Sequence, residues 1–256
     1  MISVTILTKN SQKHLKEILD SLHSFDEVVV CDTGSTDCTL EIARAYSNVS
    51  LYEKPFAGFG PTHNFASERA KNDWILSIDS DEVPSPELIK EIMEESLDPR
   101  CVYSIPRHNF FNGKWIRWCG WHPESVVRLY HRGSTCFSDE QVHEAVIAQG
   151  LRVKSFKGAL KHYSYDSIDQ FLEKMQLYSE LFAKQNVGKK RSGLGKAIAH
   201  GFYGFFKSFF LKRGFMGGFE GAVISFYNGH TAYYKYLKLR EYNRKFFDGQ
   251  RKTPDF

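Results

Sequence analysis

The first hundred residues alternate between short apolar runs and stretches with helical spacing. The runs are largely apolar and rich in β-branched residues, and they cover residues 2–8, 27–32, 49–52 and 74–78. Between the first two runs, leucine and isoleucine recur three and four residues apart. Apolar strands that alternate with helices are typical of a parallel sheet covered on both faces. The sequence therefore predicts an α/β fold with a Rossmann-like, mostly parallel sheet flanked by helices.

The pattern changes after residue 100. Strand-like pieces separated by turn residues are expected at residues 102–106, 125–130 and 142–147. A helix is expected over residues 168–182, and a linker rich in Gly, Lys and Arg follows at residues 186–196. We therefore expect a first domain over residues 1–185 and a basic, phenylalanine-rich helical extension over residues 186–256.

Composition narrows the class of protein. Lys and Arg number 34 and Asp and Glu number 30, and this net charge of +4 is too mild to indicate a nucleic-acid partner. The five cysteines include no CxxC pair, which argues against a disulfide framework or a zinc knuckle and favours a reducing compartment. The N-terminus lacks the pattern of a signal peptide. The late apolar stretch at residues 197–211 contains His200 and Lys207, and it is too short for a transmembrane helix.

Three of the predicted strands are followed by polar residues. Ligands of open α/β sheets bind beyond the carboxyl ends of the strands. The polar residues expected at that edge are Thr8, Asn10, Asp32, Ser35, Asp79, Ser80, Asp81 and Glu82. The chain has neither a GxGxxG pattern after the first strand nor a Walker loop. Dinucleotide oxidoreduction and P-loop phosphoryl transfer therefore lack their usual phosphate cradle.

Three carboxylates stand within four residues at the end of the fourth run, at Asp79, Asp81 and Glu82. Such a cluster is expected to repel itself, and Mg²⁺ or Mn²⁺ would relieve the repulsion and bridge to a substrate diphosphate. The alternative is an acidic turn ahead of a helix that begins at Ser85 and Pro86. The strand context favours the metal–diphosphate site.

Three segments together resemble the inverting family-2 glycosyltransferases with the GT-A fold. They are VTILTKN at residues 4–10, VVCDTGSTD at residues 29–37 and WILSIDSDE at residues 74–82. A further likeness, to the lipopolysaccharide inner-core β-glycosyltransferase subgroup (WaaE/KdtX-like), rests on VHE at 142–144, HYS at 162–164 and GFMGGFEG at 214–221. The resemblance implies a GT-A catalytic domain in the first part of the chain.

The resemblance also implies roles for single residues. The donor nucleotide-sugar would contact Thr8, Asn10, Asp32, Ser35, Asn64, Arg69, Asp79 and Ser80. Asp79 and Asp81 match the DxD motif of the family, and Asp81 is the expected metal ligand, with Asp79 on the ribose, on a metal-bound water or on the ion. Glu82 is expected as a third ligand or as a group behind the ligands. His162 could complete the metal shell, or it could be an ordinary packed histidine.

Inversion at the anomeric carbon requires a base that takes the proton of the acceptor hydroxyl. The resemblance points to the second half of the chain, where the candidates are Asp139, Glu140 and Glu144. Glu144 is preferred because the VHE segment is what the subgroup shares. His143 could orient Glu144 or contact a sugar hydroxyl.

Aromatic residues mark two further segments. Residues 115–123 contain three tryptophans, which could stack on acceptor sugars or simply pack the fold. The window from Lys184 to Phe219 holds eight basic residues, many phenylalanines and no acid. This mixture favours an amphipathic segment on an anionic membrane surface over a packed helical subdomain with a basic face.

The expected function is metal-dependent transfer of a hexose, with UDP-glucose as the favoured donor, to a lipid-linked saccharide such as the lipopolysaccharide inner core. The enzyme would work in the cytoplasm, peripherally attached to the inner face of the cytoplasmic membrane. One alternative is a sugar-phosphate nucleotidyltransferase, which needs a glycine-rich loop that residues 9–13 do not provide. Another is an inactive, membrane-bound sugar-binding module.

Overall fold

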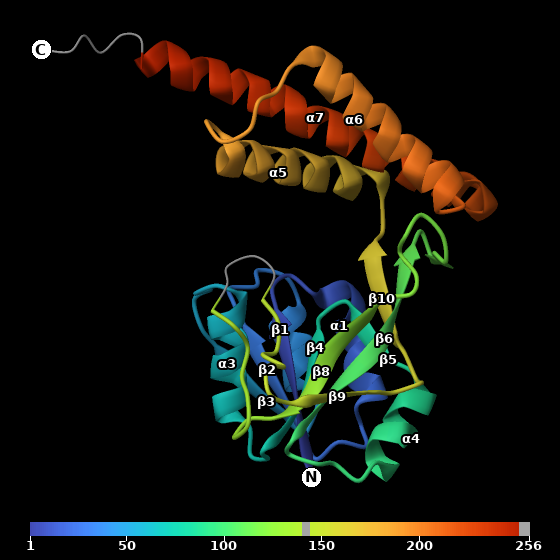
Figure 1. Cartoon of the computed structure of the whole chain (residues 1–256). Helices are drawn as coiled ribbons and strands as arrows, with labels where there is room; N and C mark the ends of the chain where they lie inside the picture. Colours follow the sequence, from blue (N-terminus) through green and yellow to red (C-terminus); the bar gives the residue numbers. More distant parts are fainter. Residues whose placement is uncertain (140–143, 251–256) are drawn as a thin grey trace, which may run out of the picture. The chain divides into compact units, whose positions relative to one another are not determined.

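Four parallel strands form the first half of the sheet in the computed structural model, which describes residues 1–139 and 144–250. β1 (Ile2–Thr8) lies between β2 (Glu27–Asp32) and β4 (Trp74–Asp79), and β3 (Val49–Glu53) pairs with the other side of β2. All three pairings are parallel (Figure 1). These strands confirm the α/β fold expected from the alternating apolar runs.

Helices cover both faces of this half-sheet because its strands bury alternate residues on opposite sides. Val28 and Val30 of β2 belong to one core cluster, and Val29 and Cys31 belong to another. The first cluster includes apolar residues of α1 (Gln12–Ser21), α2 (Thr39–Arg44) and α4 (Pro86–Glu94). The second includes Ala66 of α3 (Phe59–Arg69).

The helix α4 begins as its sequence predicts. The Ser85 side chain accepts a hydrogen bond of 3.2 Å from the backbone N–H of Leu88, and Pro86 occupies the first helical position. This cap satisfies one of the backbone donors that a helix N-terminus leaves open. The residues 79–82 at the end of β4 are called the acidic segment from here on. The chain thus turns sharply from the acidic segment into a helix that packs on the sheet.

The second half of the sheet is mixed. β8 (Ser125–His131) pairs antiparallel with β4 and with β6 (Cys101–Phe111), while β9 (Arg152–Ser155) runs parallel to β6. β10 (Leu160–Tyr165) pairs antiparallel with β5 (Glu82–Pro84). Within the described residues the strand order is β3-β2-β1-β4-β8-β6-β10-β5. An antiparallel neighbour on β4 brings β8 side chains to the acidic segment.

In the strand expected at residues 142–147, the described residues 144–147 form no continuous strand. Val142 and His143 lie outside the described residues, and the described part of this segment makes one isolated antiparallel bridge, between Phe137 and Val146. Backbone hydrogen bonds of 2.9 Å from Ser138 N to Ala145 O and of 3.0 Å from Ile147 N to Cys136 O extend this contact. The described residues on either side, 136–139 and 144–147, are therefore two loop arms outside the sheet.

The chain divides into two compact units. The first contains residues Met1–His108 and Pro123–Tyr163, and the second contains Asn109–His122 and the chain from Ser164 onward. The second unit thus includes residues 164–185, which the sequence analysis placed in the first domain. Its core cluster contains Phe111, Ile116, Phe171 and Ile224.

The second unit is mainly helical. It contains β7 (Lys114–Trp115), α5 (Ile168–Asn186), α6 (Leu194–Phe206), the short helices η1 (Lys207–Leu211) and η2 (Gly214–Gly217), and the long α7 (Gly218–Gln250). Both α5 and α6 pack along α7 (Figure 1). Glycine permits close packing of α6 and α7, because a Cβ on Gly229 would lie 3.0 Å from the carbonyl oxygen of Gly201.

The tryptophan-rich segment packs inside the second unit. The Trp121 ring stacks on Tyr165 at a centroid distance of 5.6 Å, and Tyr165 stacks on Phe171 at 3.9 Å. Trp118 also packs against the core of this unit. These contacts match the packing alternative for residues 115–123.

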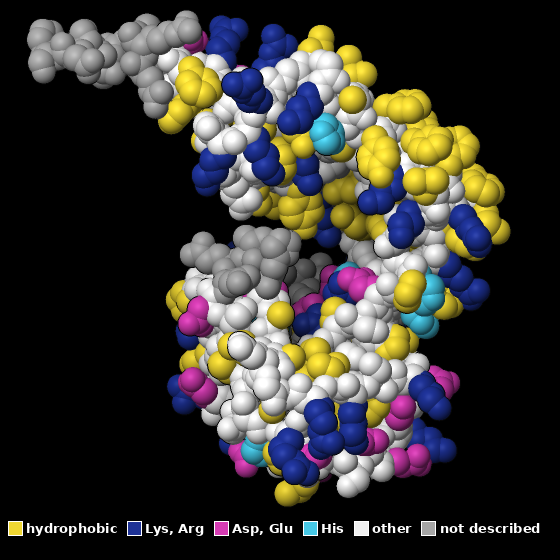
Figure 2. Space-filling model, in the orientation of Figure 1, with side chains coloured by type: hydrophobic (Ala, Val, Ile, Leu, Met, Phe, Trp, Pro, Cys, Tyr) yellow, Lys and Arg dark blue, Asp and Glu magenta, His cyan; other side chains and the backbone are white. Residues whose placement is uncertain are grey.

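Many hydrophobic side chains of the second unit remain on its surface, as Figure 2 shows. Among the described residues, no helix is both long enough and apolar enough to cross a membrane.

Candidate functional site

The loops that follow β1, β2 and β4 meet at the carboxyl edge of the sheet. The strand register places Thr8 beside Asp32 and Leu7 beside Asp79. The loops after β1 and β4 are joined directly, since Ser11 Oγ donates a hydrogen bond of 2.9 Å to Ser80 Oγ. The structure therefore brings the polar residues of three strands to one edge, as the parallel pattern predicted.

Asp32 is buried at the end of β2 and organises the loop after it. Its carboxylate accepts hydrogen bonds from the Ser35 hydroxyl (2.5 Å), the Ser35 N–H (2.8 Å), the Gly34 N–H (2.9 Å) and the Thr8 hydroxyl (2.9 Å). Gly34 adopts a φ of 105°, which side chains disfavour, so glycine suits this turn. Burial alone would raise the pKa of Asp32, but the hydrogen bonds outweigh it and hold the pKa below its usual value.

Asn10 joins the first loop to the second. It has a positive φ of 51°, a conformation that Asn tolerates better than most residues. Its N–H donates a hydrogen bond of 2.8 Å to Ser35 Oγ, and its side-chain oxygen accepts one of 2.8 Å from the Thr36 N–H. Asn10 and Ser35 are therefore parts of one rigid arrangement that surrounds Asp32.

The acidic segment after β4 is balanced largely by arginine. Arg128 of β8 forms an ion pair with Asp79, and its Nη2 lies 2.9 Å from Glu82 Oε1. Arg107 of β6 lies 3.3 Å from the same Glu82 oxygen. Glu82 is fully buried and also accepts a hydrogen bond from the Asp79 N–H. Arginine charges thus relieve the repulsion between Asp79 and Glu82, and Glu82 lies behind the exposed edge, the second of the two positions expected for it.

Arg128 is held in its charged form. Burial alone would lower the pKa of its guanidinium, but the charges of Asp79 and Glu82 raise that pKa above its ordinary value. The side chain is 9% exposed. A permanently charged group therefore lies directly behind the acidic edge.

Asp81 differs from Asp79 and Glu82, which pair with arginine, because its carboxylate lies beside a histidine. Asp81 Oδ2 lies 3.4 Å from His162 Nε2, and the aspartate side chain is 44% exposed. The antiparallel pairing of β10 with β5 places His162 opposite Glu82, and the Tyr163 N–H donates a hydrogen bond of 2.9 Å to the Asp81 carbonyl. His162, which is 81 positions from Asp81 in the sequence, is thus fixed beside the acidic segment.

The Asp81–His162 pair fits part of a divalent-cation site. Neighbouring ligands of an octahedral Mg²⁺ or Mn²⁺ stand about 3 Å apart, close to the separation observed here. Across the described residues, no group of three or more His, Cys, Asp and Glu side chains could hold a metal ion. Two protein ligands are nevertheless what such ions commonly use when substrate phosphates supply the others.

Asn64 and Arg69 have other contacts. The Asn64 side chain pairs with the peptide groups of Phe137, donating to its carbonyl at 3.0 Å and accepting from its N–H at 2.9 Å. Arg69 lies in the last turn of α3, with its guanidinium 4.9 Å from the Phe65 ring. A helix that follows one parallel strand and precedes the next ends at the amino edge of the sheet. The structure therefore does not bring Arg69 to the acidic edge.

Glu144 lies on a loop arm anchored to α3. A Cβ on Gly60 would lie 1.9 Å from the Ser138 carbonyl oxygen, so the first turn of α3 touches this arm directly. Phe137 and Val146 form the bridge between the two arms, and Asp139 and Glu144 each lie two residues from it along their own arm. Glu140 and His143, the other candidates of this segment, lie outside the described residues.

His63 fastens the same arm to the sheet. It is buried, its ring stacks on Phe137 at 4.2 Å, and its Nδ1 lies 3.1 Å from the Ser77 hydroxyl of β4. Burial lowers the pKa of His63 to about 3, and the positive charge of Arg128 adds to the shift. A neutral histidine thus joins α3, β4 and the Phe137 arm.

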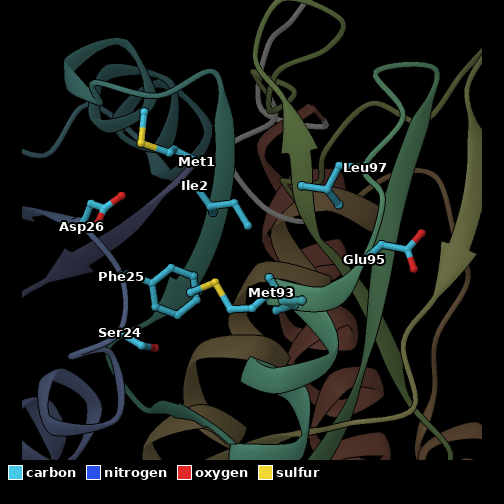
Figure 3. A pocket seen from close by; sticks show the side chains of 9 residues that line it. Met1, Ile2, Ser24, Phe25, Asp26, Met93, Glu95 and Leu97 are labelled. Atoms are coloured by element: carbon cyan, nitrogen blue, oxygen red, sulfur yellow. The ribbon is translucent and has the colours of Figure 1, made fainter.

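A pocket at the other end of the sheet contains none of the predicted site residues. It has a volume of about 240 Å³ and is lined by Met1, Ile2, Ser24, Phe25, Asp26, Ile92, Met93, Glu95 and Leu97. Figure 3 shows Phe25 and Met93 pointing toward each other across it. Ile2 begins β1, so this pocket lies at the amino edge and not at the carboxyl edge.

Sequence reasoning missed Arg107 and Arg128. Both lie on strands of the mixed half of the sheet, and Arg128 interrupts the apolar run of residues 126–130. A charged residue within a buried strand signals an ion pair, because an unpaired buried charge is very costly. The partner could not be named without the pairing of β8 with β4.

Comparisons with known proteins agree with this arrangement. The model of the family described as glycosyl transferase family 2 matches residues 3–157. A glycosyltransferase of Rickettsia typhi is 31% identical over 259 residues, which cover 95% of this chain and 88% of that protein. The lipopolysaccharide core biosynthesis glycosyltransferase LpsC of Rhizobium meliloti is 28% identical over 262 residues, or 93% of this chain and 94% of LpsC.

Among solved structures, the mannosyltransferase PcManGT of Pyrobaculum calidifontis, in complex with GDP-Man and Mn²⁺, is similar over 99% of this chain and 76% of that chain. Its sequence identity is 14% and the TM-score is 0.49. The family match covers more than half of the residues of the chain, and it includes all three polar loops of the sheet edge. The chain therefore belongs to glycosyl transferase family 2.

Proposed function

We propose that the chain is a metal-dependent, inverting hexosyltransferase. Its donor is a nucleotide-sugar, with UDP-glucose as the first choice, and its acceptor is a hydroxyl of a lipid-linked saccharide such as the lipopolysaccharide inner core. One observation carries the proposal: the partly exposed Asp81–His162 pair lies at the same sheet edge as the loop that Asp32 organises.

The nucleoside part of the donor binds at the loops after β1 and β2. Asp32 fixes this region through its four hydrogen bonds, and Thr8, Asn10 and Ser35 complete it. Asp79 and Ser80 contact the ribose and the diphosphate from the loop after β4. Loops that are already ordered before binding reduce the loss of conformational entropy when the donor binds.

Asp81 and His162 would hold the divalent ion. When bound, the ion neutralises the negative charge that develops on the departing diphosphate. The buried Arg128 keeps Asp79 fixed beside the pair, so the donor meets an edge that is already ordered.

Glu144 acts as the general base. Its carboxylate takes the proton of the acceptor hydroxyl while that oxygen attacks the anomeric carbon. The new bond forms on the face opposite the bond to the diphosphate, which breaks with its electron pair on the leaving oxygen. The configuration at the anomeric carbon is therefore inverted.

The acceptor class is proposed from the likeness to LpsC, whose name assigns it to lipopolysaccharide core biosynthesis. An acceptor with a lipid anchor is reached at a membrane, so the enzyme would work peripherally at the inner face of the cytoplasmic membrane. The basic, phenylalanine-rich stretch between Lys184 and Phe219 supplies the residues for that attachment.

The metal role is tested with Asp81→Asn and the matched control Asp73→Asn. Asp73 pairs with Arg132 ahead of β4, so its variant removes an acid of the same type away from the edge. We expect Asp81→Asn to lower Mn²⁺-dependent sugar transfer about 100-fold or more and Asp73→Asn to leave it unchanged. Full activity of Asp81→Asn in the presence of EDTA would refute the proposal.

The base is tested by comparing Glu144→Gln with Asp139→Asn. Glu144→Gln should bind UDP-glucose as the parent does, measured by thermal shift, yet turn over about 100-fold or more slowly. Normal turnover of Glu144→Gln together with loss in Asp139→Asn would move the base to the neighbouring acid.

A further inference from the structure

The second unit exposes a continuous aromatic surface. We define this surface by seven phenylalanines of α6, η1, η2 and α7, namely Phe202, Phe205, Phe206, Phe209, Phe210, Phe215 and Phe226. Neighbouring rings contact one another with centroid distances between 4.8 and 6.3 Å. Phe202 is 70% exposed and Phe215 is 54% exposed. Contiguous exposed apolar surface of this kind marks an interaction site.

A groove opens in this surface between α6 and α7. Its volume is about 280 Å³, and its lining residues are Ile198, Gly201, Phe202, Phe205, Phe226, Gly229, His230 and Tyr233. On each helix the lining positions recur at i, i+3, i+4 and i+7, so the groove runs along both helices. The volume lies at the small end of ligand sites, which suits a segment of hydrocarbon chain better than a large polar ligand.

Basic side chains border the aromatic surface, and Glu220, the nearest acid in the sequence, is paired with Lys114. Lys207, Lys212 and Arg213 are exposed and stand next to its phenylalanines in the chain. The sequence from Lys184 to Phe219 contains no Asp or Glu. Figure 2 shows Lys and Arg side chains among the hydrophobic ones on this unit. An apolar surface with a basic border complements the acyl region and the anionic headgroups of a bilayer.

We infer that the aromatic surface docks on an anionic phospholipid bilayer and that an acyl chain of the bilayer enters the groove between α6 and α7. The phenylalanines enter the boundary between headgroups and acyl chains, while the three cations meet phosphate groups. The inference rests on the proposed function only in its choice of a membrane as the partner.

The first experiment measures sedimentation of the full chain with vesicles, without donor, metal or acceptor. Phe202→Ser/Phe210→Ser/Phe215→Ser removes three exposed members of the surface. The matched control, Phe246→Ser/Phe247→Ser, removes exposed phenylalanines from the distant end of α7. We expect the parent and the control to sediment with phosphatidylglycerol vesicles, less with phosphatidylcholine, and the triple variant to stay in solution. Neutralising the three cations by glutamine should weaken binding about fivefold per charge.

A second measurement uses a milder change. Phe202→Trp places a fluorophore in the groove, and vesicles with brominated acyl chains should quench its fluorescence beyond that of the parent protein. Equal quenching in the two proteins would overturn the inference, as would unchanged binding of the triple serine variant. The inference would also be overturned if the parent protein formed dimers and the triple variant were monomeric. The surface would then bind a second copy of the chain.

The thermal shift with UDP-glucose is measured on the same variants. It should be unchanged in all of them, because none of the altered residues belongs to the donor site. A chain that binds vesicles but no nucleotide-sugar would refute the proposed function alone, and the reverse result would refute the docking surface alone.

Discussion

Arg128 Nη2 donates a hydrogen bond of 2.9 Å to Glu82 Oε1, and both side chains are buried. The pair joins two strands that are far apart in the sequence, since Arg128 lies on β8 and Glu82 begins β5. It places a positive charge behind the acidic edge, where Asp79 also reaches it. The stability of the fold and the shape of the candidate site therefore depend on the same guanidinium.

Arg128→Met should destabilise the protein by about 3–5 kcal/mol, because Glu82 would stay buried with too little compensation. Urea unfolding followed by circular dichroism measures this loss. The double change Arg128→Met/Glu82→Gln should recover much of it, since the unpaired charge is then gone. The control Arg44→Ala removes an exposed ion pair with Glu53 and should leave stability unchanged. Equal losses in the single and double variants would contradict this account.

Asp32→Asn should cost about 1–3 kcal/mol of stability, because an amide group would face donors that now approach both carboxylate oxygens. The pKa of Asp32 lies below its usual value, so its charged form stabilises the fold fully above the unfolded value of about 3.9. This contribution is lost as the pH falls through the folded pKa. Urea unfolding of parent and variant should therefore give a constant difference at neutral pH and a shrinking one in acid. A difference that grows toward low pH would show that the sign is wrong.

His162→Gln should raise the Mn²⁺ concentration needed for half-maximal transfer at least about tenfold, because one of two proposed protein ligands is lost. Activity at saturating Mn²⁺ should recover in part. His131→Gln provides a control, since His131 ends β8 and lies opposite Trp74 at the start of β4. An unchanged Mn²⁺ requirement in His162→Gln would remove His162 from the metal site.

Gly60→Ala should lower both stability and turnover. The added Cβ would lie 1.9 Å from the Ser138 carbonyl, a backbone atom that can yield only by moving the arm that leads to Glu144. Gly195→Ala is the matched control, because a Cβ there meets nothing within 4 Å and the residue lies in α6. Alanine in place of a helical glycine should raise stability by about 0.5–1 kcal/mol. Thermal unfolding and transfer assays separate the two effects.

The parallel half of the fold was predictable because its information is local. Each buried run of β1, β2 and β4 marks its own strand, and the polar residue at its end marks the edge. Asp32 and Asp79 could therefore be placed together before any pairing was known. The alternation of strands and helices carries this information without reference to distant residues.

The environment of the acidic segment could not be predicted in the same way. Arg128 reaches Asp79 only because β8 pairs antiparallel with β4, and spacing along the chain says nothing about that pairing. The peptide contacts of Asn64 with Phe137 are equally non-local. The Asp81–His162 contact was approached through family resemblance, and its geometry required the pairing of β10 with β5.

The ion pair of Arg128 with Asp79 and Glu82 has a consequence for the catalytic cycle of the proposed enzyme. Because this guanidinium already neutralises Asp79 and Glu82, these two acids need no metal ion to remain side by side in the folded chain. In the proposed enzyme, the metal ion can therefore bind together with each donor molecule and leave with the released nucleotide. It would then be a ligand of the substrate complex and not a permanent part of the protein.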